Sequence, residues 1–150
     1  MIDDFDRPLN DRGKSDAKLI GEFMNRQKIA PDIALSSPAR RARQTAEKVL
    51  KAAALEAQIE FDQGIYEAEA RRLFEIVREI PDERNSVMLV GHNPGFEELL
   101  HLLTGGSISF PTAALARIEL PTERWCDVRL RSGTLRSFVT PKNLKGEANN

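Results

Sequence analysis

Histidine and arginine side chains stand where two apolar stretches of the sequence give way to helical patterns. His92 follows the run SVMLVG and precedes Asn-Pro, while Arg40, Arg41 and Arg43 follow DIALSSPA. Guanidinium groups bind phosphate oxygens in a fork, and helix N-termini offer free backbone N–H groups to the same anion. An imidazole at a helix start has a lowered pKa unless an anion lies nearby. If the two junctions meet, they form a pocket for a phosphoryl group.

Each junction also has an ordinary structural explanation. An arginine cluster on a helix is usually a solvated basic face, although each cation in the first turns costs roughly a few tenths of a kcal/mol against the helix dipole. A single histidine is more often a hydrogen-bonded structural residue than a catalytic one. His101 lies within the apolar pattern ELLHLLT, which favours a structural role. The sequence does not favour a zinc site, because His92 and His101 have neither a second motif histidine nor a cysteine pattern beside them.

The elements that must position these residues alternate between strand and helix. Ser37 is the predicted N-cap of the helix that carries the arginines, with Pro38 in its first position. Helical spacing covers residues 10–29, 37–53, 67–80 and 94–106.

Strand patterns fill the intervals. The run at 86–90 is continuously apolar, as in strands that a parallel sheet buries on both faces. The last pattern indicates two strands around a turn at Ser132 and Gly133. Strands are predicted at 32–37, 57–63, 86–90, 113–120 and 127–139. This order predicts a three-layer α/β/α fold with a largely parallel sheet, whose ligands lie beyond the carboxyl ends of the strands.

Composition limits the remaining choices. The 150 residues are 41% hydrophobic, which predicts one domain over 1–150 with a polar tail from about Lys142. The formal net charge of -1 gives no indication of a nucleic-acid or membrane partner. The single cysteine, Cys126, excludes an internal disulfide framework and fits a cytoplasmic location. No segment approaches the roughly 18 to 20 apolar residues of a membrane span.

The two junction motifs resemble those of a known family. SSPARRARQTAE resembles the phosphate-binding segment of the histidine phosphatase superfamily, and VGHNP resembles the segment with its second histidine. DFDRPLNDRGKSDA and IYEA are similar to its small branch of SixA-type phosphohistidine phosphatases, so the match runs from about Asp4 to Pro94. The resemblance implies a phosphoglycerate mutase-like fold. It also implies that Arg41 binds phosphate and that His92 is the second pocket histidine.

The resemblance suggests two further site residues. Glu67 lies near the position where many relatives place a carboxylic general acid. Arg7 is a candidate to face the pocket, and an exposed structural role is the alternative. Arg40 and Arg43 fall at variable positions of the family pattern.

The family chemistry requires neither a metal nor another cofactor. A neutral imidazole attacks phosphorus in line and forms a covalent phosphohistidine, which water then cleaves, while fixed cations hold the equatorial oxygens. The expected partner is a phosphorylated protein, such as a histidine phosphotransfer domain, or a small phosphate ester. Only one helix separates the strands at 57–63 and 86–90, so no large lid covers the pocket.

The family's nucleophile belongs to an Arg-His motif at the end of a first strand, and this sequence lacks that motif. Its two histidines are His92 and His101, and nothing before Asp4 resembles the expected strand. We favour a fragment over a natural non-catalytic relative, because loss of an interior strand leaves a gap in the sheet. Without the nucleophile, Arg41 and His92 would still bind phosphate, and His92 would need an altered geometry to attack it. A misfolded remnant is the third alternative.

Overall fold

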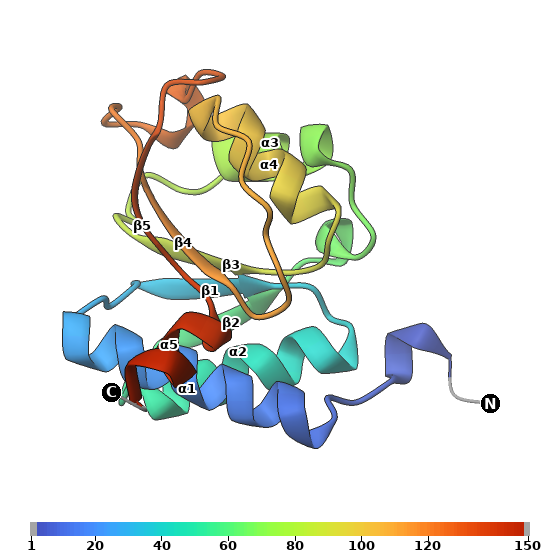
Figure 1. The fold of residues 1–150 in the computed structure, drawn as a ribbon. Coiled ribbons are helices and arrows are strands. Elements are labelled where there is room, and N and C mark those ends of the chain that lie inside the picture. Colours follow the sequence, from blue (N-terminus) through green and yellow to red (C-terminus); the bar gives the residue numbers. More distant parts are fainter. Residues whose placement is uncertain (1–2, 149–150) are drawn as a thin grey trace.

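The computed structural model describes residues 3–148, which form helical layers on both sides of the strands (Figure 1). Three strands make a parallel sheet in the order β2-β1-β3, and two more form a separate antiparallel pair. The parallel strands are β1 (Ile33–Ser36), β2 (Gln58–Phe61) and β3 (Val87–Val90). The antiparallel pair is β4 (Leu115–Glu119) and β5 (Thr134–Val139).

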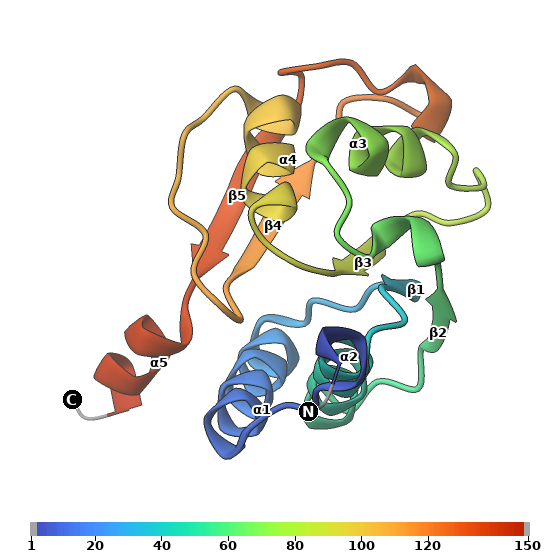
Figure 2. The same cartoon turned by 90° about the vertical axis from the view of Figure 1, so that its right-hand side faces the viewer.

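The helices divide between the two faces of the strands, as the alternating pattern predicts (Figures 1 and 2). The helices α1 (Asp11–Gln27), α2 (Arg40–Ala52) and α5 (Pro141–Ala148) lie on one face. The other face carries α3 (Ala70–Arg78) and α4 (Gly95–Thr104). Short 3-10 turns are η1 (Asp4–Asp6), η2 (Gln63–Ile65) and η3 (Trp125–Asp127). Within residues 3–148, no helix combines the length and the apolar character that crossing a bilayer requires.

Two apolar clusters hold the layers together. One lies between α1, α2, β5 and α5, and the other lies between α3, α4 and the segments around them. The first contains Ala17, Ile20, Met24, Val49, Ala53, Val139 and Leu144. The second contains Ile65, Leu73, Ile76, Leu99, Leu103 and Val128. The clusters fix α2 and α4, the two helices whose N-termini follow β1 and β3.

The helix that carries the arginines begins later than its sequence suggests. Ser37 and Pro38 were expected as its N-cap and first residue, but α2 begins at Arg40 with Ala39 as its N-cap. Ala39 has an extended backbone (φ -56°, ψ 140°), which is incompatible with a helical turn before Arg40. The Ser37 hydroxyl accepts the Ala39 N–H ahead of the helix, and its own proton remains for a tertiary contact.

The segment at 127–139 forms one strand rather than two. Arg131 and Gly133 donate backbone hydrogen bonds to the carbonyls of Leu102 and Leu103, at 2.7 Å each, so these donors serve the last turn of α4 instead of a sheet. Only β5 remains as a strand, paired with β4. Satisfaction of helix-end carbonyls has displaced the predicted hairpin.

The end of the described chain also differs from the predicted polar tail. Residues 141–148 form α5, and Leu144 is buried against α1. Lys145 forms an ion pair with Asp16, with 3.0 Å between Nζ and Oδ1. Asp16 is a buried residue of α1. Leu144 and the ion pair of Lys145 thus connect α5 to α1.

β3 is only half-buried, whereas its continuous apolar run predicts full burial. The reason is its position in the sheet. Among residues 3–148, β3 pairs with β1 on one side and stands at the edge of its sheet on the other. A groove therefore separates β3 from β4.

Close contact between α1 and α2 predicts a sensitive position at Gly21. A Cβ added there would meet the Val49 carbonyl oxygen and lie 2.6 Å from Ala52 Cβ. We expect Gly21→Ala to lower the free energy of unfolding by about 1–3 kcal/mol in a urea titration. Gly146→Ala is the matched control, because its Cβ meets no atom within 4 Å, and it should be neutral or stabilising by up to about 1 kcal/mol. Equal effects of the two variants would contradict this packing.

Candidate functional site

Parallel pairing of β1 and β3 brings the two predicted junctions together. Ser36 lies opposite Val90 in the register, so both strands end at the same edge of the sheet. The Ser37 N–H then donates to the Val90 carbonyl at 2.9 Å, which extends the pairing by one residue. Beyond this point the chain leads from Ser37 to Arg41 on one side and reaches His92 on the other.

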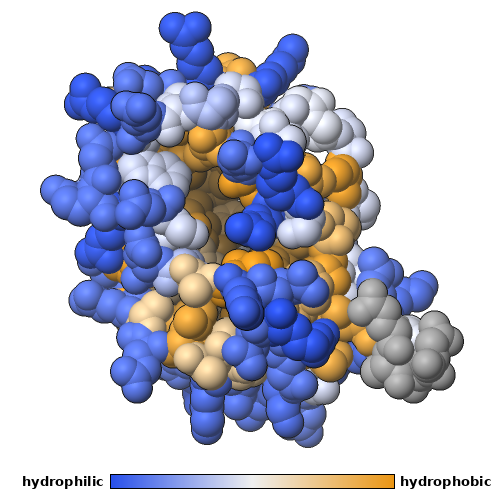
Figure 3. All heavy atoms as spheres, turned by 90° about the vertical axis from the view of Figure 1, so that its left-hand side faces the viewer, coloured by the Kyte–Doolittle hydropathy of each residue, from blue (hydrophilic) through white to orange (hydrophobic). Residues whose placement is uncertain are grey.

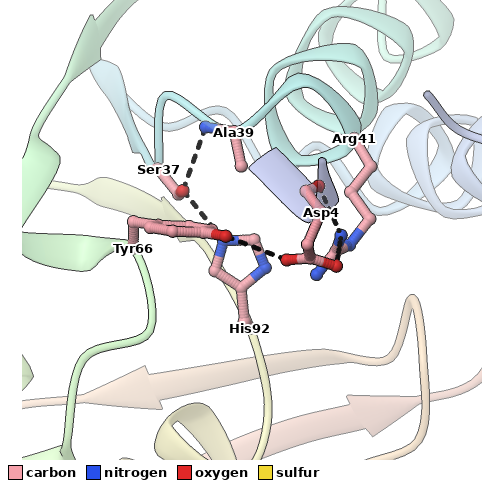
Figure 4. A network of polar contacts seen from close by, with 6 residues as sticks. All are labelled: Asp4, Ser37, Ala39, Arg41, Tyr66 and His92. Carbon is pink, nitrogen blue, oxygen red and sulfur yellow. Dashed lines mark hydrogen bonds and ion pairs between the residues drawn. The ribbon is translucent and has the colours of Figure 1, made fainter. Parts of the chain in front are cut away.

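A hydrogen bond between side chains fixes the imidazole of His92. Its Nε2 lies 2.8 Å from the hydroxyl of Ser37, which is fully buried (Figure 4). The same hydroxyl accepts the Ala39 N–H at 3.2 Å, which leaves its own proton for a neutral Nε2. The other ring nitrogen, Nδ1, points to the side where Asp4 and Arg41 lie (Figure 4).

The carboxylate of Asp4 lies between Arg41 and Tyr66. Its Oδ1 accepts a hydrogen bond from Arg41 Nη1, and its Oδ2 accepts one from the Tyr66 hydroxyl, each at 2.9 Å (Figure 4). Arg41 Nη1 also lies 3.3 Å from the Asp4 carbonyl oxygen. An anion is therefore held beside His92 by one guanidinium and one phenol.

Aromatic contacts frame this arrangement. Tyr66 meets the His92 ring edge to face, with 5.5 Å between the ring centroids, and meets Phe5 in the same manner at 5.2 Å. Edge-to-face contacts of this kind contribute about 0.5–1.5 kcal/mol beyond area burial. Phe5 thereby anchors η1, and η1 presents Asp4 to Arg41.

The electrostatic environment favours a neutral His92 and an ionised Asp4. Burial lowers the pKa of His92, and the nearby positive charge of Arg41 lowers it further. The hydrogen bonds from Arg41 and Tyr66 lower the pKa of Asp4. Removal from water and the hydrogen bond to Asp4 together raise the pKa of Tyr66 to about 12, so its hydroxyl remains a donor.

Asp4, Arg41 and His92 line a cleft of about 730 Å³ at the N-terminus of α4. Gly95 begins that helix and lies so close to the Ala68 carbonyl that no Cβ fits. Glu67 lines the cleft as an exposed carboxylate on a left-handed backbone with φ 53°. The cleft thus combines two guanidinium groups, two imidazoles, four carboxylates and a helix N-terminus.

Other sequence candidates stand apart from this centre. Arg40 and Arg43 are exposed and do not line the cleft. Arg7 is also exposed and outside the lining, although its charge contributes to the lowered pKa of Asp4. His101, in contrast, lines the same cleft, and its Nδ1 lies 3.2 Å from the Gly106 carbonyl oxygen.

Sequence reasoning missed three residues of the site. The sequence pattern predicts helix capping for Ser37, and Asp4 and Tyr66 occur in it only within longer motifs. The Ser-Ser-Pro segment offered a signal for Ser37, because a hydroxyl at the end of a buried strand lies where ligands bind. The contact between Asp4 and Tyr66 joins residues 62 positions apart and leaves no local pattern.

Comparison with known proteins connects this geometry to a family. The sequence model described as histidine phosphatase superfamily (branch 1) matches residues 2–83. A relative in Mycobacterium leprae, an uncharacterized protein, is 29% identical, and the alignment covers 94% of this chain and 91% of that protein.

Two solved structures are similar over nearly the whole chain. The putative phosphohistidine phosphatase SixA from Agrobacterium tumefaciens is 30% identical with a TM-score of 0.80, over 93% of this chain and 87% of that one. A structure of the protein histidine phosphatase SixA complexed with tungstate is 25% identical with a TM-score of 0.82, over 96% and 90% of the two chains.

The position of His92 predicts that its titration responds to phosphate. Without phosphate, the pKa of His92 should lie below the ordinary value of 6.5. As the pH falls through 6.5, the unfolded chain therefore takes up the proton before the folded chain does. His92 then lowers the free energy of unfolding. Bound phosphate adds negative charge beside the imidazole and should raise this pKa. NMR titration of the imidazole nitrogens measures both values. Arg43→Ala should respond like the unmodified chain, and a His92 signal indifferent to phosphate would contradict the proposed position of the anion.

Proposed function

This chain belongs to the histidine phosphatase superfamily, and we propose that it is the phosphate-binding domain of a SixA-type phosphohistidine phosphatase. The observation that carries the proposal is the bound carboxylate of Asp4. Its two oxygens contact Arg41 and Tyr66 next to His92, which is how an oxyanion substrate would be held. A phosphoryl group that displaces Asp4 would meet the same donors at the N-terminus of α4, where the helix dipole favours negative charge.

In the proposed reaction, Arg41 and His92 hold the equatorial oxygens of the phosphoryl group. The nucleophile is the imidazole of an Arg-His pair that lies outside this sequence. Its nitrogen lone pair forms a bond to phosphorus as the bond to the leaving group breaks, and the leaving group takes a proton from Glu67. Water then attacks phosphorus and gives a proton to the Glu67 carboxylate as the P–N bond breaks, which releases phosphate and restores both the free imidazole and the protonated Glu67. This route uses no metal ion, because Arg41 and a protonated His92 supply the positive charge.

The proposed substrate is a phosphohistidine on a protein surface. Asp4 and Arg41 have 47% and 33% of their side chains exposed, so the anion site is open to a large partner. The segment between β2 and β3 consists of η2, α3 and short connections, which leaves the cleft uncovered on that side. A histidine phosphotransfer domain fits these requirements, and small phosphate esters are the alternative substrates.

The second candidate function is phosphate or phosphoprotein binding without turnover. The observation in its favour is that the sequence offers His92 and His101 but no Arg-His pair. Both candidates use the same anion site, so phosphate binding does not separate them. The two candidates are separated by hydrolysis of phosphohistidine, measured on a chain to which the nucleophile has been supplied.

Isothermal titration calorimetry with inorganic phosphate tests the anion site through variants of opposite effect. Arg41→Ala removes charge-assisted hydrogen bonds worth about 1.5–3 kcal/mol and should weaken binding by about 10-fold to 100-fold. Asp4→Asn removes the competing anion while it keeps the side-chain shape, and it should strengthen binding several-fold.

Arg43→Ala is the matched control, because Arg43 lies two residues from Arg41 on the same helix and is exposed outside the cleft. Its phosphate affinity should equal that of the unmodified chain. Equal losses in Arg41→Ala and Arg43→Ala would indicate general attraction to a basic helix and would overturn the proposed site. Weaker binding in Asp4→Asn would show that Asp4 supports the anion rather than competes with it.

A further inference from the structure

Asn93, the residue after His92, binds two other parts of the chain through its side-chain amide. Its Oδ1 accepts the Glu97 N–H of α4 at 3.2 Å, and its Nδ2 donates to the Phe110 carbonyl. Glu97 in turn accepts the Phe110 N–H on its Oε1 at 2.9 Å. Two side chains at the start of α4 therefore satisfy both backbone groups of Phe110. We call Asn93, Glu97 and Phe110 the Asn93 clamp.

The clamp holds the segment 105–114, which contains no helix or strand. This segment leaves α4 at Gly105 and returns alongside that helix towards β4 (Figure 2). At its start, the Gly106 carbonyl oxygen lies 3.2 Å from the His101 Nδ1, and further along the clamp binds Phe110. The segment is thus tied to α4 near both ends of the helix.

The Phe110 side chain anchors the same segment to the antiparallel strands. Its ring contacts that of Phe138 in β5, with 5.9 Å between the ring centroids. Phe110 also lines the hollow of about 1110 Å³ between β3 and β4, whose walls are mainly hydrophobic (Figure 3). The start of α4 fixes the backbone of Phe110, and β5 contacts its ring. The clamp therefore connects β5 with the residue that follows His92.

The position of His92 depends on hydrogen bonds from two directions. Its carbonyl accepts the Phe96 N–H at 3.1 Å, and the Asn93 side chain accepts the next N–H, that of Glu97. The first turn of α4 thus holds two consecutive residues. On the other side, the imidazole lies 2.8 Å from the Ser37 hydroxyl. A side chain that must meet the oxygens of a small anion needs a position fixed to within about 0.5 Å, so both supports matter for binding.

We propose that Asn93 is a positioning residue, which sets the place of the His92 imidazole for the phosphoryl group through the Asn93 clamp. This inference rests on the proposed function and adds a residue to it. Asn93 lines the cleft, but the oxygen and the nitrogen of its amide are both bonded within the chain. It therefore acts through His92 rather than on the phosphoryl group.

Asn93→Ala tests the proposal, because it removes the amide and leaves the His92 side chain in place. We expect the affinity for inorganic phosphate, measured by isothermal titration calorimetry, to fall by about 3-fold to 10-fold, which corresponds to the net loss of one hydrogen bond. The rise in the His92 pKa on phosphate binding, measured by NMR, should become smaller. A purely structural role of Asn93 would change neither quantity. Unchanged values of both would overturn the proposal.

Gly21→Ala is the control for a general loss of stability. The substitution disturbs the contact between α1 and α2 and lies outside the cleft. It should lower the urea midpoint of unfolding and leave the phosphate affinity of the folded chain unchanged. An equal loss of affinity in Gly21→Ala and Asn93→Ala would assign the effect to stability and would count against a positioning role.

Two substitutions of Glu97 test the clamp without a change next to His92, and they decide the outcome if Asn93→Ala does not fold. Glu97→Gln and Glu97→Ala both remove the negative charge, but only glutamine keeps an oxygen that can accept the Phe110 N–H. The difference between the two variants therefore isolates this hydrogen bond. Glu97→Ala should bind phosphate about 3-fold to 10-fold more weakly than Glu97→Gln. Equal affinities would contradict the role of the clamp.

Failure of the proposed function gives a different result. If phosphate does not bind the unmodified chain, or if Arg41→Ala binds it equally well, the anion site itself is wrong. The clamp is then still tested by the NMR signals of the His92 imidazole without phosphate. These signals should shift in Asn93→Ala and in Glu97→Ala but not in Gly21→Ala. Unshifted signals in the first two variants would refute the positioning role alone.

Discussion

The parallel pairing of β1 with β3 is the constraint on which the candidate site depends. Two parallel strands end at the same edge, so residues more than fifty positions apart, Ser37 and His92, meet without any long loop. The hydrogen bond from the Ser37 N–H to the Val90 carbonyl extends this pairing one residue beyond the end of β1. A slip of one residue would turn every side chain of β3 to the opposite face and separate His92 from Arg41.

In the function that we propose, the internal carboxylate of Asp4 and an external oxyanion compete for one anion site. Arg41 and Tyr66 hold Asp4, and the burial of His92 keeps its imidazole neutral at rest. The site therefore avoids two adjacent unpaired cations when no ligand is bound. In the same proposal, displacement of Asp4 makes these donors available to a phosphoryl group, and the rise in the pKa of His92 then links proton uptake to anion binding.

The sequence was sufficient for features that depend on local pattern and order. Strand-helix alternation predicted the layers, and the convergence of Arg41 and His92 followed from the ends of two parallel strands. Non-local features were missed: Asp4 and Tyr66 meet across the fold, and backbone bonds to α4 from Arg131 and Gly133 replaced a predicted hairpin. The half-buried state of β3 could not be read from its apolar run, because burial depends on neighbouring strands.

A crystal structure of the chain soaked in tungstate tests the central claim most directly, since the heavy anion identifies its own position. One oxyanion should lie within hydrogen-bonding distance of both the Arg41 guanidinium and the His92 imidazole, with the Asp4 carboxylate displaced from Arg41. Tungstate bound elsewhere, with the contact between Asp4 and Arg41 intact, would contradict the account.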